Sequence, residues 1–463
     1  MKFAVMLANR GFFPGELIAG AREDLRKALA ACGHEALFME GAGTRYDAVE
    51  TMEEGRKFAD FLAARKGQYD GVILSQPNFG DENGAFVALR DAGVPILVQA
   101  YPDEAGLMDF AHRRDALCGK LAMCNVLRQA GIRHSLTRRF CVKPDSADFA
   151  EDLRLFGATC RVANGMRRVN VGAIGARTTA FKTVRFDEVA FMGAGINVET
   201  IDLSLVFKLM DEADPAAVAA MGKRHADYAD FGTWPEEKAE NLARLGVALD
   251  IVRDRFGLDA MAIRCWDELQ LRYGIAPCLA MSILNQDGLP ASCEMDVDNA
   301  VMMRAINLAS GAPVAVFDVN NNFGDAADRC IMFHCSAMPA GMMVGKPSVG
   351  EHAMFRKAYG AGSGVGILNA PVAKSPLTVG SLKTEDGKVC AFVTEGEITD
   401  DKIEEAFFGT GFVFRKDDGD CEAMLRYMAR NGYRHHVSFA AGKWAAAIAE
   451  AFGTYLGYAV DRI

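Results

Sequence analysis

Short apolar runs alternate with longer amphipathic stretches over the first 165 residues, and this alternation constrains the fold more than any other feature. Helical spacing of apolar residues in the amphipathic stretches predicts helices. The apolar runs predict strands at residues 3–8, 36–39, 71–75 and 95–100. Repeated strand–helix units form a parallel sheet that helices cover on both faces. We therefore expect an α/β N-terminal domain over residues 1–165.

A second α/β domain is expected over residues 166–305. A strand-like run into a glycine-rich turn opens this region, three helical patterns follow, and AMAIRCW predicts another strand at 260–266. Both domains are thus expected to be Rossmann-like or flavodoxin-like. The segment ANRGFFPG after the first strand does not fit the G-x-G-x-x-G dinucleotide fingerprint, so we expect no nucleotide cofactor.

The pattern of predicted secondary structure changes after residue 310. Short β-rich runs (VAVFDV, RCIMFHC, KVCAFVTE and TGFVFR) are separated by Gly, Pro and Asp, which predicts an antiparallel sheet or a small barrel. Two helical patterns follow, near 420–431 and 442–456. We expect a β-rich C-terminal domain over residues 306–463, and a length of 463 residues suits three domains of ordinary size.

Charge and hydropathy narrow the range of partners. The 51 Lys and Arg against 61 Asp and Glu give a net charge of −10, and such a surface repels nucleic-acid phosphates. No apolar run reaches the ~18 residues of a membrane span. The short apolar run at the N-terminus reads as a strand and not as a secretion signal. We expect a cytoplasmic protein that binds neither nucleic acid nor membrane.

The twelve cysteines are scattered from Cys32 to Cys421 without any C-x-x-C pair. This scatter indicates reduced thiols in a reducing cytosol and argues against a zinc knuckle or an iron–sulfur cluster. His334 and Cys335 are adjacent in the chain, and neighbours on a strand point to opposite faces. A thiol–imidazole pair is therefore not expected there.

Two acidic residues interrupt strongly apolar runs, namely Glu294 and Asp318. A carboxylate buried in such surroundings needs a partner, a metal or a raised pKa. Of the eight histidines, His334 and the pair His435–His436 lie in an apolar, strand-like context. Two carboxylates with one or two imidazoles fit a divalent metal that prefers oxygen ligands, with Mn²⁺ first and Mg²⁺ or Co²⁺ next.

These residues resemble the metal-binding positions of the L-fucose isomerase and L-arabinose isomerase family of metal-dependent ketol isomerases. The intervals are 24 residues from Glu294 to Asp318 (318 − 294), 16 to His334 (334 − 318) and 102 to His436 (436 − 334), which match the family pattern. The resemblance implies Glu294, Asp318 and His436 as metal ligands, the set of the fucose branch. The arabinose branch adds a middle histidine, which falls on His334, and binds through the second member of its HH dipeptide, which selects His436.

Each of these residues alone also has a structural explanation. Glu294 is compatible with a charge at the start of the following helix. Asp318 is compatible with a cap on the turn at 320–322, and His334 with a hydrogen-bonded core histidine. Their joint spacing favours the metal site over these separate explanations.

Two further residues are candidates for binding the substrate. Glu268 follows a buried strand at its carboxyl end, where α/β proteins place their ligands, and a structural ion pair is the alternative. Arg177 lies in the loop GARTTAF, and the alternative there is a contact with a backbone carbonyl.

The resemblance implies interconversion of an aldose and a ketose through a divalent-metal-bound enediol. Glu294 and Asp318 would move the proton from C2 to C1, with a direct hydride shift as the competing route. It also implies a homo-oligomer, a trimer or a hexamer, in which a neighbouring subunit closes the pocket over a small sugar. Two other classes stay open: a metal-dependent aldolase or epimerase acting on a sugar or sugar acid, and a non-catalytic sugar-binding protein.

Overall fold

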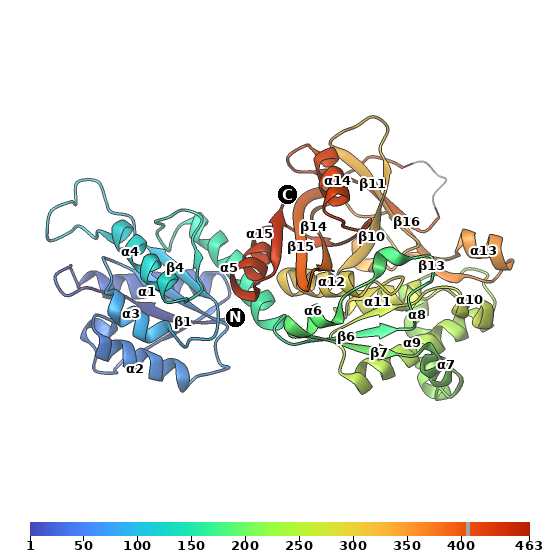
Figure 1. Ribbon diagram of the computed structural model, residues 1–463, viewed down its shortest axis with the longest axis horizontal. Coiled ribbons are helices and arrows are strands. Elements are labelled where there is room, and N and C mark those ends of the chain that lie inside the picture. The colour runs from blue at the N-terminus through green and yellow to red at the C-terminus, as the bar shows by residue number, and fades with distance from the viewer. Residues whose placement is uncertain (404–407) are drawn as a thin grey trace. The chain divides into compact units, whose positions relative to one another are not determined.

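The computed structural model describes residues 1–403 and 408–463, which fall into two compact units (Figure 1). The first unit consists of residues 1–164 and 450–457, and the second of residues 165–449 and 458–463. Two parallel sheets with helices and a β-rich sheet towards the C-terminus confirm the predicted α/β class. The finer division at residues 165 and 305 stays a prediction.

The first unit contains a five-stranded parallel sheet with the order β2-β1-β3-β4-β5. Its strands are β1 (Lys2–Leu7), β2 (Glu35–Phe38), β3 (Gly71–Gln76), β4 (Ile96–Ala100) and β5 (Ser135–Leu136). The four strands predicted in this region are confirmed. Strands β1, β3 and β4 are apolar runs buried between two layers of helices, whereas β2, at the edge of the sheet, is only half-buried.

Helices cover both faces of this sheet. On one face, Phe3 and Val5 of β1 pack with α1 (Leu17–Ala31) and α5 (Ala147–Gly165). On the other face, Ala4 and Met6 pack with α2 (Met52–Ala63), α3 (Glu82–Leu89) and α4 (Ala116–Gln129). The alternation of neighbouring residues between two cores follows from the two-residue repeat of a strand.

A second parallel sheet, with the order β7-β6-β8-β9, opens the second unit. Its strands are β6 (Val169–Ile174), β7 (Ile196–Ile201), β8 (Ala260–Ile263) and β9 (Ala291–Ser292). The sequence did not predict β7, because polar residues such as Asn197 and Glu199 interrupt its apolar pattern. The helices of this region are α6 (Glu188–Gly193), α7 (Leu203–Asp211), α8 (Pro215–Tyr228), α9 (Glu236–Phe256), α10 (Glu268–Tyr273), α11 (Cys278–Gln286) and α12 (Val297–Ser310).

The β-rich part of the second unit is a small closed barrel, as predicted. Its strands are β10 (Ala315–Asn322), β11 (Arg329–His334), β14 (Ser375–Glu385), β15 (Lys388–Ile398), β16 (Thr410–Lys416) and β17 (His436–Ala441). They pair antiparallel in the order β14-β17-β10-β11-β16-β15, and a further pairing of β14 with β15 closes the ring. Strand β18 (Ala459–Arg462) adds to β15 in parallel.

Shorter elements complete this unit. Strands β12 (Ser348–Glu351) and β13 (Val365–Asn369) form a hairpin-like pair with α13 (Ala353–Tyr359) between them. The two helical patterns near the C-terminus become α14 (Cys421–Arg430) and α15 (Ala445–Glu450), and a π-helical segment continues α15 over Ala451–Leu456. In the described part of the chain, no helix combines the length and apolar character that a membrane crossing requires.

Strand register and the docking of α12 determine where the polar side chains of this unit meet. In the β10–β17 pair, Asp318 stands directly opposite His436. Strand β11 pairs with the other edge of β10 and ends at His334. Helix α12 packs against β14 and β17, so the residues just before it reach the same end of the barrel.

Candidate metal and catalytic site

Four side chains singled out in the sequence lie together at this end of the barrel. The Nε2 atom of His436 is 2.9 Å from an Oε2 oxygen of Glu294 and 3.4 Å from Oδ1 of Asp318. Donor atoms of Glu294, His334 and His436 all lie within 4.8 Å of one another. The structure thus brings together Asp318 from the middle of β10, His334 from the end of β11 and His436 from the start of β17 with Glu294 from a loop.

Glu294 reaches this cluster from the loop between β9 and α12, at the carboxyl end of the parallel sheet. Both Glu294 and Met295 have left-handed backbone conformations, with φ of 57° and 61°. Side chains other than Gly adopt this conformation at a cost of about 1–2 kcal/mol per residue. The surrounding packing therefore holds the backbone of Glu294 in a conformation that it would not adopt alone, as occurs at many binding sites.

His436 is held on both ring nitrogens by carboxylates. Its Nδ1 is 2.8 Å from Asp296 Oδ2, and its Nε2 is the atom that faces Glu294. Burial would lower the pKa of His436, but the hydrogen bonds and charges of Asp296 and Glu294 outweigh it and raise this pKa to about 10. Burial would likewise raise the pKa of Glu294, yet the hydrogen bond and charge of His436 lower it overall.

Asp296 belongs to a buried ion-pair network that the sequence interpretation missed. The Arg434 guanidinium donates to Asp296 through Nη1 and to Asp298 through Nη2. Asp296 also caps α12 by accepting from the backbone of Asn299 at 3.1 Å and from its side chain at 2.8 Å. All these groups are buried, so the charge of Arg434 stabilises the carboxylate that orients His436.

The two carboxylates of this network differ in their acidity. Burial opposes ionisation of Asp296, but Arg434 and His436 lower its pKa below the usual range. Burial raises the pKa of Asp298 to about 7, helped by the charge of Asp296 and opposed by Arg434. Asp296 is therefore the permanently charged partner of Arg434.

A signal for this network was present in the sequence. Asp296 and Asp298 follow Glu294 at two-residue steps in EMDVD, and Arg434 precedes the histidine pair. A lone arginine and two acidic residues among apolar residues are expected to pair if they are buried. Only the packing of α12 on β17 shows that they pair with one another across more than 130 residues of chain.

Asp318 offers an oxygen without a hydrogen-bond donor. Its Oδ1 is buried and accepts no hydrogen bond from the described residues. The nearest imidazole atoms are Nε2 of His436 at 3.4 Å and Nε2 of His435 at 3.7 Å. An orphaned carboxylate oxygen beside a second carboxylate and two or three imidazoles is a donor set that suits a divalent cation.

A cavity of about 250 Å³ adjoins the cluster. Glu294 forms part of its wall, and the rings of Trp266, Phe355 and Tyr359 form another part. Pockets for drug-sized ligands usually measure roughly 300–1,000 Å³, so this one suits a smaller molecule. An apolar wall with a few polar groups at one end is the usual construction of a small-molecule site.

The two candidate substrate-binding residues lie outside this wall. Glu268 pairs with Arg264 at 2.9 Å, and Arg177 donates to the backbone carbonyls of Thr178 and Thr179 at 3.1 and 3.3 Å. Neither is among the described residues that line the cavity. These contacts match the structural alternatives for both residues, and their binding roles stay predictions.

The expectation for His334 and Cys335 was wrong. Strand β11 ends at His334, so the alternation of side chains does not extend to Cys335. The Cys335 sulfur lies 3.2 Å from Nδ1 of His334 and 3.7 Å from the sulfur of Cys278. A thiol–imidazole contact is therefore present beside the cluster.

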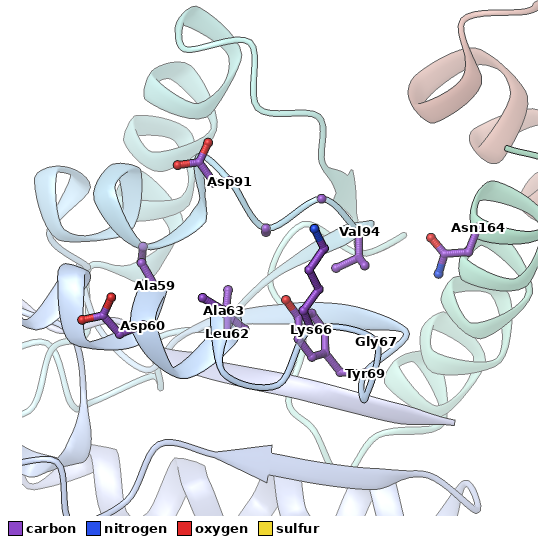
Figure 2. Close-up of a pocket in the computed structure, with 13 residues that line it drawn as sticks. Ala59, Asp60, Leu62, Ala63, Lys66, Gly67, Tyr69, Asp91, Val94 and Asn164 are labelled. Carbon is purple, nitrogen blue, oxygen red and sulfur yellow. The ribbon is translucent and has the colours of Figure 1, made fainter. Parts of the chain in front are cut away.

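A larger cavity, of about 690 Å³, lies in the first unit (Figure 2). Its wall includes Lys66, Tyr69, Asp91, Val94 and Asn164. Tyr69 and Val94 precede β3 and β4, which places this cavity at the amino ends of these strands. Open α/β sheets bind their ligands at the carboxyl ends, so volume alone does not make this cavity the functional site.

Two family models match the chain. The N-terminal domain of fucose/sulfoquinovose isomerase matches residues 4–167, and the C-terminal domain of L-fucose isomerase matches residues 332–463. Several curated sulfoquinovose isomerases are similar over part of their length. The protein from Priestia aryabhattai is 23% identical over 322 residues, 66% of this chain and 67% of its own. The proteins from Alkalicoccus urumqiensis (23% identical, 66% of this chain, 65% of its own) and Clostridium sp. strain MSTE9 (21% identical, 48% and 50%) are similar as well.

Proposed function

The chain belongs to the fucose/sulfoquinovose isomerase family, whose members interconvert aldoses and ketoses. From this premise we propose that the protein isomerises a small aldose. The reaction would take place at the cluster of Glu294, Asp318 and His436, with the help of a divalent cation. The observation that carries this proposal is the convergence of these three side chains, distant in the chain, beside a cavity of sugar-sized volume.

Glu294, Asp318 and His436 would hold the cation, with His334 as an additional ligand. The orphaned oxygen of Asp318 and the close approach of Glu294 to Nε2 of His436 support this assignment. A mixed carboxylate and imidazole set favours Mn²⁺, with Mg²⁺ or Co²⁺ as alternatives. When bound, such an ion supplies Lewis-acid polarisation of the sugar's C1 carbonyl and C2 hydroxyl.

Asp296 would act on His436 as a positioning residue. A proton on Nδ1 shared with Asp296 leaves the Nε2 lone pair free for a ligand, and metal-bound histidines in proteins usually have such a carboxylate or carbonyl partner. Arg434 keeps Asp296 ionised, so Asp296 continues to accept the Nδ1 proton of His436 when a cation takes the place of the Nε2 proton.

Glu294 is our choice for the base that removes the C2 proton. It lines the cavity, whereas Asp318 does not belong to the described wall. Its lowered pKa keeps it ionised near neutral pH, as a base must be. The proton on Glu294 then passes to Asp318, the candidate acid, which delivers it to C1 of the cis-enediol as the C2 hydroxyl proton moves to O1.

Sulfoquinovose, a glucose with a sulfonate at C6, is the first substrate to test because the similar curated proteins carry its name. A sulfonate usually pairs with Arg or Lys. Among the described residues that line the cavity, the charged ones are Asp267 and Glu294, together with the titratable His352. A neutral deoxy sugar such as L-fucose is therefore the second candidate.

The test is a panel of aldoses, with sulfoquinovose and L-fucose among them, assayed for ketose after chelator treatment and after addition of Mn²⁺, Mg²⁺ or Co²⁺. We expect ketose with one sugar only when a cation is restored. Full turnover by metal-free protein would contradict the proposal, and release of shorter fragments would indicate an aldolase instead. Solvent deuterium in the product supports the enediol route, and its absence supports a hydride shift.

We also propose a homo-oligomer, a trimer or a hexamer, in the cytoplasm. Light scattering coupled to size exclusion measures the assembly directly. An active monomer would contradict this part of the proposal without affecting the assignment of Glu294, Asp318 and His436.

A further inference from the structure

Four cysteines that are far apart in the sequence meet at one wall of the cavity. Cys265 follows β8, Cys278 begins α11, Cys293 follows β9 and Cys335 follows β11. All but Cys335 are buried, and Cys265, Cys278 and Cys335 line the cavity. Solutes that enter the cavity thus have access to three sulfur atoms.

Three donors of this cluster lie close enough together to share one ion: the donor atoms of Cys293, His334 and Cys335 are all within 4.8 Å of one another. Cys335 has three sulfur or nitrogen neighbours: Cys278 Sγ at 3.7 Å, His334 Nδ1 at 3.2 Å and Cys293, whose donor atom lies within 4.8 Å of both His334 and Cys335. A tetrahedral zinc ion with Zn–S bonds of about 2.3 Å separates its sulfurs by about 3.8 Å. The Cys278–Cys335 separation is already that of two ligands of one such ion.

From this geometry we propose a second cation site, in which Cys293, Cys335 and His334 bind one thiophilic d¹⁰ cation and Cys278, which contacts Cys335, completes the donor set, Zn²⁺ being the physiological choice. Three thiolates and one imidazole are a usual tetrahedral donor set for zinc. The scattered sequence spacing hides this set because each ligand comes from a different element. Thiolate donors also exclude Mg²⁺ and disfavour Mn²⁺, so the site is distinct in its selectivity from the carboxylate cluster.

Zinc bound at the thiol site would affect the isomerase site, because His334 contributes a donor atom both to the group with Cys293 and Cys335 and to the group with Glu294 and His436. An ion held by Cys335 and His334 withdraws the imidazole from Glu294 and His436 and places a positive charge at the cavity wall. Zn²⁺ should therefore inhibit turnover by the Mn²⁺-loaded enzyme. This consequence, unlike the binding itself, rests on the proposed function.

Cobalt spectroscopy tests the binding without any sugar. Reduced wild-type protein, loaded with Mn²⁺ and kept anaerobic, is titrated with Co²⁺ and then with Zn²⁺. We expect sulfur-to-cobalt charge-transfer bands and intense tetrahedral visible bands that saturate at one equivalent and disappear when one equivalent of Zn²⁺ is added. Absence of charge-transfer bands at saturating Co²⁺ would overturn the proposal, and this result is independent of whether an isomerase substrate is ever found.

Single variants locate the ligands. Loss of a residue that only orients a metal ligand already weakens a metal site by about 10- to 100-fold. Loss of a ligand itself, in Cys335→Ser or Cys278→Ser, should therefore raise the Zn²⁺ dissociation constant at least about tenfold. Cys390→Ser, in β15 and outside the cluster, is the matched control and should change it by less than about twofold. Equal Zn²⁺ affinity in Cys335→Ser, Cys278→Ser and wild type would refute the assignment even if the wild type binds zinc elsewhere.

Inhibition is measured as the ratio of rates with and without Zn²⁺ within each variant, so that a change of basal rate does not matter. We expect the wild type and Cys390→Ser to lose activity with Zn²⁺ and to recover it with a chelator followed by Mn²⁺. Cys278→Ser should need at least about ten times more Zn²⁺ for the same loss. The same sensitivity in Cys278→Ser and wild type would contradict the shared use of His334.

Discussion

Replacing Asp296 with Asn tests how the imidazole of His436 is oriented. In the wild type, Oδ1 of Asp296 accepts from Arg434 and from the backbone of Asn299, while Oδ2 faces Nδ1 of His436 and accepts from the side chain of Asn299. The amide of Asn has only one oxygen. Arg434 and the backbone N–H of Asn299 can only donate, and Arg434 is charged, so this oxygen is expected on their side and the NH₂ group on the His436 side, at the loss of the hydrogen bond from the Asn299 side chain.

The expected result is a switch of tautomer. With a donor facing it, Nδ1 of His436 has to accept, and the ring proton moves to Nε2, where Glu294 accepts it at the 2.9 Å contact. The lone pair for the cation is then lost. Changes to such outer-shell partners weaken metal binding by about 10- to 100-fold, which corresponds to about 1.4–2.7 kcal/mol.

The substitution also affects folding. Removing one partner of a buried ion pair usually costs about 3–5 kcal/mol. Arg434 keeps its second carboxylate, Asp298, so we expect the lower end, about 3 kcal/mol of unfolding free energy. Denaturant unfolding of the metal-free protein measures this loss separately from metal affinity.

The assay is a Mn²⁺ titration of Asp296→Asn followed by electron paramagnetic resonance of the free ion, beside the isomerase rate. Asp298→Asn is the matched control, because Asp298 touches Arg434 but not His436 and, with a pKa of about 7, is already partly protonated at neutral pH. The control should shift the Mn²⁺ dissociation constant by less than about threefold. If Asp296→Asn and Asp298→Asn bind Mn²⁺ as tightly as the wild type, the positioning role of Asp296 is refuted.

Three further predictions concern the base, a buried lysine and the barrel core. Glu294→Gln should lower kcat by about 10²- to 10⁴-fold, the usual contribution of a general base, whereas Glu268→Gln should not; equal losses in the two variants would remove Glu294 from that role. Burial lowers the pKa of Lys120 to about 8, so below that pH the charged form of Lys120 opposes folding. Between pH 7 and pH 10 the folded protein loses this charge, and the unfolding free energy of the wild type should rise by about 2 kcal/mol relative to that of Lys120→Met. A flat difference across that range in denaturant titrations would contradict the pKa. Phe317→Ala should cost about 3–5 kcal/mol, because Phe317 is fully buried between the rings of the barrel, and a loss under 1 kcal/mol in the same unfolding assay would show that the barrel core relaxes around the cavity.

Periodicity predicts the parts of this fold that are regular and apolar. Four of the five strands of the first sheet and most barrel strands contain apolar runs, and their ends were predicted to within three residues. The two-residue strand β5 was not predicted. Strand β14 was missed because Ser, Thr, Gly and Lys make up much of SPLTVGSLKTE, although most of its residues are buried. Its burial comes from two neighbouring strands and from α12, which local sequence does not record.

The candidate site also contains residues that the sequence predicted and residues that it did not. Glu294, Asp318, His334 and His436 stood out because charged or imidazole groups interrupt apolar runs at intervals that resemble a known pattern. The partners of these residues were not predicted, because Arg434 and Asp296 come into contact only when α12 packs against the barrel. The four thiols escaped notice for the same reason, as no two of them share an element.

The chain enters the first unit twice, over residues 1–164 and again over 450–457. In the second passage, the Tyr455 hydroxyl hydrogen-bonds with the backbone of Ile96 at 3.1 Å and with Ser135 Oγ at 2.8 Å. A fragment cut after residue 164 would expose the edge that this tyrosine covers. Chimeras that exchange the N-terminal region between homologues thus have to transplant both pieces together, because the exchangeable cassette is not contiguous in the gene.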